Sequence, residues 1–562
     1  MIPNRRTLAL VLFLAACSRE GTQDGDVTFN ADVAPILFEN CAICHRPGGA
    51  GPFDLLTHRD ARKHARQIVE VTDSGYMPPW LPEAGYGEFA GTRGLSAAEI
   101  ETLARWANAD TPEGRPGDLP PTPQWSEGWQ LGRPDLVVHL DRPYTLAAEG
   151  PDVYRNFVLP VQVETTRYVK AVEFRPGNAR IVHHGRLLID RTPSSRSLDA
   201  QDDAPGWDGM TWGNAETPDG MLLGWTPGKV ALDPPEGMAW RLERGTDLVL
   251  QLHMISSGKP ESIQPSVGLY FADEPPTLHP FAFVLGSRDI AIPAGEDNYP
   301  VTDSYVLPVD VEALGIYPHA HYVAKRMHVF AELPGGERQW LIRIDDWDFN
   351  WQDEYRYAAP VALPRGTRLV MEYTYDNSSA NARNPSFPPR PVVYGAQSSD
   401  EMAELMLQVL PRNPQDRAAL EADYERREVQ GAVAFRRARL AANPADGESH
   451  AALGSTYLHL GSVEDAIPHL REAVRLLPED ARQRNNLAYA LALHGEPDGA
   501  IQQYEHAVRL EPNFGAAHFG LAGVLLEQGR TDDAIEHYRE VLRIRPDAAE
   551  ARQALERLVA GQ

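Results

Sequence analysis

The chain has 562 residues, of which 43% are hydrophobic and 23% charged, and its formal net charge is −26 at pH 7. A chain of this length holds about three to five domains that each bury a core. The negative charge argues against nucleic acid and anionic membrane surfaces as partners, and it is consistent with a soluble, exported protein.

The first residues predict export. Arg5 and Arg6 precede a short apolar run over residues 8–14, which ends in small residues and Cys17. The run is too short to remain as a transmembrane helix, so we interpret residues 1–17 as a signal peptide. It resembles a bacterial lipoprotein signal, which implies that Cys17 is lipidated and that this anchor is the protein's only attachment to a membrane. In a two-membrane bacterium, Ser18 after the cysteine favours the periplasmic face of the outer membrane. An ordinary signal peptide with an incidental cysteine is the alternative.

Residues 26–117 are predicted to form a small helical haem domain. Cys41, Cys44 and His45 make a CxxCH motif, the attachment signature of a c-type haem. Helical apolar spacing over residues 30–40 brings the two thiols to the end of a helix, where each can add to a haem vinyl group. The adjacent histidine can then ligate the iron from one side. A redox dithiol or half a zinc site is the alternative interpretation.

The second axial ligand is expected to be Met77, because a thioether is a common partner of histidine in such cytochromes. Filling of the core is the alternative role for this methionine. Residues 95–108, with Trp106, are predicted to form an amphipathic closing helix. His58 and His64 are other possible ligands, although they fit solvated helix positions better. With these features the region resembles short class I cytochromes c.

A β-rich region extends from residue 133 to about residue 411. Its short runs, separated by Pro- and Gly-rich turns, lie at residues 136–140, 248–253, 267–271 and 368–373. This pattern favours antiparallel sandwiches or jelly rolls over helices. The length suggests two all-β domains, 133–275 and 276–411, with the boundary near residues 273–280.

Six candidate metal ligands lie in this region: His183, His184, His253, His319, His321 and Met402. Five imidazoles and one thioether form a ligand set suited to copper, and the soft thioether would stabilise Cu(I). His319 and His321 are two apart, so in a strand they point to one face and can chelate one ion. His183 and His184 are adjacent, so joint ligation needs a local twist or bulge.

Along the chain these residues form HH, QxH, HxH and DEM motifs, with Gln251 and Asp400 opening the second and fourth. About half of the chain thereby resembles the copper type II, ascorbate-dependent monooxygenases, the family of peptidylglycine α-hydroxylating monooxygenase and dopamine β-monooxygenase. The resemblance implies two jelly-roll domains that each hold one copper across a solvent cleft. It assigns His183, His184 and His253 to an electron-storing copper, and His319, His321 and Met402 to the catalytic copper that reacts with O2 and attacks a C–H bond. Taken singly, an HH or HxH motif is more often a satisfied polar pair.

The chain departs from this family at several positions. The animal members are disulfide-rich, whereas the β-rich region here contains no cysteine. Tyr317 stands where peptide-amidating members have an arginine that anchors the substrate carboxylate, and Glu404 and Met406 also differ. Peptide amidation is therefore not expected. The Tyr and Met residues suggest a less anionic organic substrate.

The C-terminal region, residues 431–562, repeats with a period of 34: Pro444, Pro478, Pro512 and Pro546 are equally spaced. The period and the small residues match the tetratricopeptide pattern, an α-helical solenoid. Three full repeats are predicted at 447–480, 481–514 and 515–548, with a degenerate half-unit near 431–444 capping the start. Such repeats favour a protein partner, with dimerisation or packing on the copper region as the alternative.

Together the regions predict an exported copper- and haem-dependent monooxygenase that hydroxylates a small organic substrate with O2. Its own cytochrome would relay electrons from ascorbate or a redox protein to two copper ions. One alternative is an electron-transfer or copper-binding protein that hydroxylates nothing and docks through its repeats. Another is a scaffold with degenerate metal regions.

Overall fold

The computed structural model describes residues 27–47, 49, 51–124, 128–229, 235–395 and 397–560. Cys17 and the signal segment lie outside these residues, so their assignment stays a prediction. The chain divides into two compact units, Met1–Arg417 and Ala418–Gln562. None of the helices in the described segments is both long enough and apolar enough to cross a membrane.

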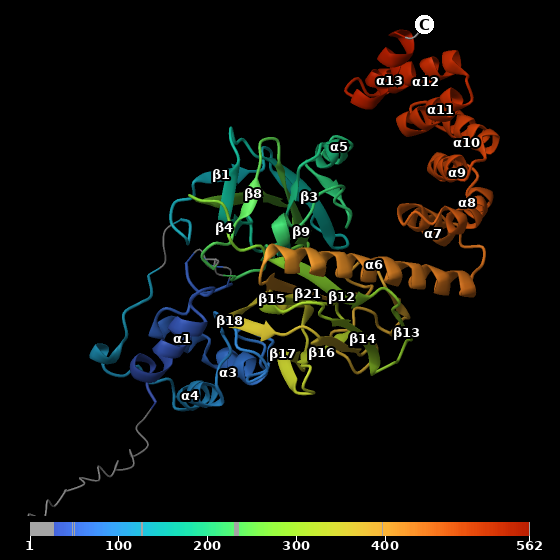
Figure 1. The fold of residues 1–562 in the computed structure, drawn as a ribbon. Helices are drawn as coiled ribbons and strands as arrows, with labels where there is room; N and C mark the ends of the chain where they lie inside the picture. Colours follow the sequence, from blue (N-terminus) through green and yellow to red (C-terminus); the bar gives the residue numbers. More distant parts are fainter. Residues whose placement is uncertain are drawn as a thin grey trace, which may run out of the picture. The chain divides into compact units, whose positions relative to one another are not determined.

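The first unit begins with a helical part (Figure 1). Its helices are η1 (Phe29–Val33), α1 (Ala34–Asn40), α2 (His58–Lys63), α3 (Ala65–Asp73), α4 (Ala97–Asn108) and η2 (Pro116–Asp118). The helices expected over 30–40 and 95–108 are confirmed. Helix α4 begins at a capping box, in which Ser96 and Glu99 satisfy each other's backbone N–H groups. Phe29, Leu37 and Trp106 are fully buried in the core of this part.

The next part is a β-sandwich. Its strands are β1 (Leu136–His139), β2 (Tyr144–Leu146), β3 (Val153–Pro160), β4 (Arg167–Arg175), β5 (Val182–Asp190), β6 (Trp207–Asp208), β7 (Gly224–Trp225), β8 (Trp240–Leu242), β9 (Asp247–Met254), β10 (Glu261–Ile263) and β11 (Ser266–Ala272). They form a four-stranded sheet β1-β11-β4-β8, a five-stranded sheet β6-β3-β9-β5-β7 and a two-stranded sheet β10-β2. Helices α5 (Ser194–Asp199) and η3 (Pro218–Gly220) lie in the connections.

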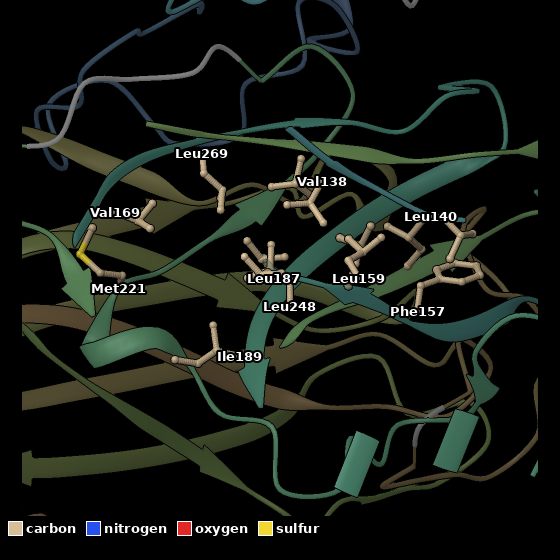
Figure 2. Packing of buried hydrophobic residues seen from close by; sticks show 14 of the residues in the cluster. Val138, Leu140, Phe157, Leu159, Val169, Leu187, Ile189, Met221, Leu248 and Leu269 are labelled. Carbon is tan, nitrogen blue, oxygen red and sulfur yellow. The ribbon is translucent and has the colours of Figure 1, made fainter. Parts of the chain in front are cut away.

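Side chains from both larger sheets meet in one core, part of which Figure 2 shows. Val169 and Leu269 come from the four-stranded sheet, and Phe157 and Leu187 from the five-stranded sheet. All eight residues of β9 are buried. Its outer face is covered as well, because Val249 packs in a second cluster that includes side chains around α5. This central, doubly covered strand holds His253 firmly in place.

The second sandwich begins after residue 280. Its strands are β12 (Phe281–Ser287), β13 (Ala291–Ile292), β14 (Tyr299–Val306), β15 (Val311–His319), β16 (Ala324–Glu332), β17 (Arg338–Ile344), β18 (Tyr355–Leu363), β19 (Arg368–Tyr375), β20 (Val392–Val393) and β21 (Ala403–Pro411). Two four-stranded sheets, β12-β21-β15-β18 and β14-β19-β16-β17, carry most of them, and β13 pairs with β20. Tyr373 of β19 donates to the carbonyl of Glu404 in β21 at 3.1 Å, so the two sheets are joined by a hydrogen bond as well as by packing.

The C-terminal unit is helical, as the repeat predicted. Its helices are α6 (Pro414–Ala442, which begins in the first unit), α7 (Gly447–His459), α8 (Val463–Leu476), α9 (Ala481–Leu493), α10 (Pro497–Leu510), α11 (Gly515–Glu527), α12 (Thr531–Ile544) and α13 (Ala549–Ala560). Each predicted repeat is one helix pair. Gly454 explains the small-residue pattern, because a Cβ there would lie 2.5 Å from Cγ of Leu470. The predicted half-unit is the end of the continuous helix α6.

Candidate metal and haem sites

The CxxCH motif lies at the end of α1. Cys41 is the C-cap of that helix, and the N–H of His45 donates to the carbonyl of Cys41 at 2.9 Å, which turns the motif into one compact loop. Cys41 and Cys44 are free thiols. Burial, with a smaller effect of Cys44, raises the pKa of Cys41 to about 12, so the thiol is neutral at physiological pH.

His45 is oriented by a backbone acceptor. Its Nδ1 lies 2.9 Å from the carbonyl oxygen of Phe53, and its ring packs on the Phe53 ring at 4.8 Å. A proton on Nδ1 leaves Nε2 with a free lone pair, the arrangement of a metal-ligating histidine. Burial lowers the pKa of His45 and thereby favours the neutral form that ligation needs.

A cavity of about 380 Å³ brings the four predicted haem residues together, and we call it the Cys41 cavity. Cys41, Cys44, His45 and Met77 all line it, and so does Trp351, which belongs to the second sandwich. The two thiols, the free imidazole nitrogen and the thioether therefore form a donor set that fits a covalently attached haem.

The two other histidines of the helical part are engaged elsewhere. His58 Nε2 lies 2.8 Å from the carbonyl oxygen of Thr111. His64 stacks on Phe53 with ring centroids 3.7 Å apart, and its Nδ1 lies 3.1 Å from Gln67 Oε1. His58 and His64 are therefore half-buried and make structural contacts, rather than lying at the solvated helix positions that the sequence favoured.

His183, His184 and His253 form the first histidine set. The expected irregularity at the adjacent pair is present, because the register of β5 against β9 shifts between Val182 and His184. Each histidine places one ring nitrogen within 4.8 Å of the others. Stacking holds the rings in place. The ring centroids of Tyr154 and His253 are 4.3 Å apart with an interplanar angle of 3°, and those of Phe349 and His183 are 4.7 Å apart with an interplanar angle of 28°.

Two nitrogens of the first set are buried and have no hydrogen-bond partner among the described residues: His183 Nε2 and His253 Nδ1. Asp152 explains which nitrogen of His253 is free, since its Oδ2 lies 3.1 Å from His253 Nε2. A carboxylate on the far nitrogen fixes the tautomer of a metal-binding histidine. Burial, with a smaller effect of His253, lowers the pKa of His183 to about 3, so the ring is a neutral donor.

His319, His321 and Met402 form the second ligand set, at the end of β15 and directly before β21. The rings of His319 and His321 are 5.3 Å apart and nearly perpendicular. His319 Nδ1 lies 2.7 Å from Gln352 Oε1, and His321 Nδ1 lies 3.1 Å from the carbonyl oxygen of Asp400. A hydrogen bond at Nδ1 therefore orients each ring. Burial lowers the pKa of His321 to about 3.

Glu401 holds the backbone of the second ligand set. Its carboxylate accepts hydrogen bonds from the N–H groups of His321 at 2.8 Å, Val323 at 2.9 Å and Met402 at 3.0 Å. Burial raises the pKa of Glu401 to about 8, although the backbone donors act in the opposite direction. One buried side chain thus fixes both segments that carry the second set.

The two sets lie next to each other. The rings of His184 and His319 are 6.5 Å apart, and the amide of Gln352 contacts both, with Nε2 at 3.0 Å from His184 Nδ1 and Oε1 at 2.7 Å from His319 Nδ1. This differs from the pair of sites across a solvent cleft that the family resemblance implies. The reason is the short helix η4 (Phe349–Trp351): it places Phe349 and Gln352 against both sets.

Four residues of these sites were not identified from the sequence: Asp152, Phe349, Gln352 and Glu401. Glu401 stood within the DEM motif, so its position next to Met402 was a usable signal. The other three lie in segments without a motif: Asp152 precedes β3, Phe349 is in η4 and Gln352 follows it. Only the folded sandwiches bring them into place.

Comparison with known proteins identifies the repeats. The tetratricopeptide repeat family matches residues 417–481 and 485–549, so the C-terminal unit carries such repeats, which indicate a role in protein–protein interaction. A comparison with curated proteins finds no match. Among solved structures, one entitled "Crystal structure of MamA" is 28% identical over 26% of this chain and 84% of its own, with a TM-score of 0.24. "First TPR of Spaghetti (RPAP3) bound to HSP90 peptide SRMEEVD" is 19% identical over 20% of this chain and 91% of its own, with a TM-score of 0.20.

Proposed function

We propose that the chain is an exported oxidoreductase that hydroxylates a C–H bond of a small organic substrate with O2. In this proposal it belongs with the copper type II monooxygenases in its jelly-roll region and with class I cytochromes c in its helical part. The first histidine set and the second ligand set each hold one copper, and Cys41, Cys44, His45 and Met77 hold one haem c. Bound copper would supply the oxygen chemistry and bound haem the electrons.

The residues support these assignments through their donor chemistry. Burial lowers the pKa of His183 in the first set and of His321 in the second, and the neutral imidazole that results is the form that binds copper. His183 and His253 each keep a buried nitrogen without a partner in the described part of the chain, which is costly unless a ligand satisfies it. Met402 adds a soft thioether beside His319, since both line one cavity.

The observation that carries the proposal is the segment 349–353, because it contacts both candidate redox sites. Trp351 lines the Cys41 cavity and packs on Tyr76 at 5.4 Å. The next residue, Gln352, bonds to both His184 and His319. An electron leaving the Cys41 cavity would therefore cross one tryptophan and one amide side chain to reach either ligand set.

The remaining assignments concern location and partners. Lipidated Cys17 would anchor the protein to the cell envelope, and the repeats would dock a protein, for example the electron donor. Ascorbate is the small-molecule alternative for that donor.

The test is an oxygen pulse given to the anaerobically reduced protein and followed by stopped-flow absorbance, with metal content measured first. We expect two coppers per haem and joint reoxidation of haem and copper. His319→Ala should slow haem reoxidation. His328→Ala is a matched control, because His328 lies on β16 outside both ligand sets and pairs with Asp345. Absence of bound copper, or the same haem kinetics in His319→Ala, would refute the monooxygenase. Oxygen uptake without a hydroxylated product would favour the electron-transfer alternative.

A further inference from the structure

A second cavity, of about 550 Å³, opens beside the two ligand sets, and we call it the His184 cavity. His184, His319 and Met402 line it, so any molecule inside lies next to both candidate copper positions. Much of its remaining wall is apolar and includes Trp212 and Met406. The cavity is therefore suited to the apolar body of a small organic molecule.

Arg186 projects from β5 into this wall. It is two residues after His184, so the two side chains share one face of the strand. Its Nη2 donates to Thr217 Oγ1 at 3.0 Å and lies 3.7 Å from Met406 Sδ. The guanidinium is also 5.5 Å from the centre of the Trp212 ring. All three neighbours are uncharged.

The guanidinium of Arg186 is half-buried in this wall, where a countercharge would stabilise it. Its hydrogen-bond partner is the uncharged Thr217, and no carboxylate within the described segments forms an ion pair with it. Glu354, a carboxylate on the same cavity, is already bound by Lys229 Nζ at 3.2 Å and by the N–H of Gly224 at 3.2 Å. Glu404 also lines the cavity and attracts Arg186 electrostatically, but it forms no ion pair with it. Desolvating a cation without a partner is costly, which favours an anionic occupant.

We propose that the His184 cavity binds a small organic carboxylate, with the carboxylate on Arg186 and the apolar body towards His319 and Met402. Arginine is the side chain best suited to two parallel bonds to a carboxylate. The reading of this site as a substrate site rests on the proposed function, whereas carboxylate binding itself does not. Arg186 on β5 supplies the cation, so no arginine is needed at the position of Tyr317. An anionic substrate departs from the expectation drawn from Tyr317 and Met406.

The test compares 3-phenylpropionate with its neutral amide, 3-phenylpropionamide. Binding to the haem- and copper-loaded protein is measured by calorimetry under anaerobic conditions, so no turnover is needed. We expect the acid to bind at least about tenfold more tightly than the amide, as befits a charged hydrogen-bonded pair. Arg186→Gln should remove this preference, and Arg186→Lys should retain part of it.

Arg326→Gln is the control, because Arg326 is an exposed arginine of β16 that does not line the cavity. It should leave the preference for the acid within about twofold. Copper electron paramagnetic resonance and the haem spectrum confirm that each variant is folded. If Arg186→Gln does not load copper, Glu404→Gln gives an independent measurement, since removing a negative charge beside the cavity should tighten acid binding.

The outcomes separate the two proposals. Equal affinity for acid and amide in the unaltered protein, or an unchanged preference in a folded Arg186→Gln variant, would overturn carboxylate recognition. Weaker acid binding in Glu404→Gln would do the same. If the acid binds through Arg186 but no organic carboxylate supports oxygen uptake with a hydroxylated product, carboxylate binding stands and the monooxygenase assignment fails. If only neutral compounds are hydroxylated, the monooxygenase assignment stands and the proposal of a carboxylate substrate is refuted.

Discussion

At the residue scale, the clearest division of labour is between His253 and Asp152. His253 lies in the fully buried strand β9 and cannot move its ring away from the first histidine set. Asp152 binds Nε2 and leaves Nδ1 free. Burial alone would raise the pKa of Asp152, but hydrogen bonds from His253 and Ser398 outweigh it and lower that pKa. The carboxylate is therefore charged and fixes the tautomer of the histidine.

Loss of this carboxylate should weaken copper binding. In Asp152→Ala we expect copper affinity of the first histidine set to fall about 10- to 100-fold, the usual cost of removing such a partner. Asp152→Asn should lose less, because its amide oxygen can still accept from Nε2–H. Anaerobic competition with a chromophoric Cu(I) chelator measures both, and the exposed Asp141→Ala is the control. Wild-type affinity in Asp152→Ala would show that the carboxylate does not orient His253.

At the element scale, local patterns were the most predictable part of the chain. Helices occupy most of residues 30–40 and 95–108, and the 34-residue period gives one helix pair per repeat. Even the irregularity at His183 and His184 followed from strand geometry, since side chains alternate along a strand.

Contacts between elements were not predictable in the same way. Gln352 contacts His184, which is 168 positions away in the sequence, and His319, which is 33 positions away, and no local pattern marks it. The side-by-side placement of the two ligand sets depends on the packing of one sandwich against the other, which the spacing of motifs does not encode. The half-unit near residues 431–444 is continuous with α6, because no proline interrupts the helix after Pro414 and the helix runs through Gly431 to Ala442.

The repeats contain two equivalent histidine pairs. His450 Nδ1 lies 3.0 Å from His469 Nδ1, and His518 Nδ1 lies 2.9 Å from His537 Nδ1. In the middle repeat the same positions hold Arg484 and Gln503, which are 3.2 Å apart. Burial, and then the neighbouring histidine, lowers the pKa of both His469 and His537. Each pair is therefore most compatible with the fold when it is not fully protonated.

These pairs should make the first and third repeats sensitive to acid. In the unfolded chain a histidine has a pKa of about 6.5. Because the folded values of His469 and His537 are lower, the unfolded state binds more protons below that pH, and stability falls as pH drops through this range. We expect hydrogen exchange of α7–α8 and α11–α12, corrected for intrinsic rates, to quicken from pH 7 to pH 5.

Glutamine provides the control for this pH dependence, since Gln503 shows that the fold accepts it. The double variant His469→Gln, His537→Gln should lose most of the added exchange at pH 5 and change little at pH 7. If the double variant and the unaltered protein respond equally to acid, the histidine pairs are not the source of the effect.

At the scale of the whole molecule, the first unit joins its helical part to the second sandwich by backbone pairing. The N–H of Ala90 donates to the carbonyl of Arg356 at 2.9 Å, and the N–H of Ala358 donates to the carbonyl of Glu88 at 2.8 Å. The half-buried ion pair of Arg93 with Asp353, at 3.0 Å, lies beside the segment that contacts both candidate redox sites. Backbone bonds of this kind limit relative movement, so the Cys41 cavity keeps its distance from the histidines.

Trp351 should therefore control how fast electrons pass between the two sites. Its ring lines the Cys41 cavity, and its Nε1 is buried without a partner among the described residues. Trp351→Leu replaces an aromatic bridge by a shorter aliphatic one, so we expect flash-induced transfer from haem to copper to slow at least about tenfold, while Trp351→Phe slows it less. Haem potential and copper content are measured in each variant, because a merely structural role would change these as well. Trp340→Leu, on β17 and packed against Tyr86, is the control for loss of an indole. Equal transfer rates in Trp351→Leu and the unaltered protein, with potentials unchanged, would mean that electrons reach the histidines by another path. The variant Gln352→Leu would then show whether that path includes the amide between His184 and His319.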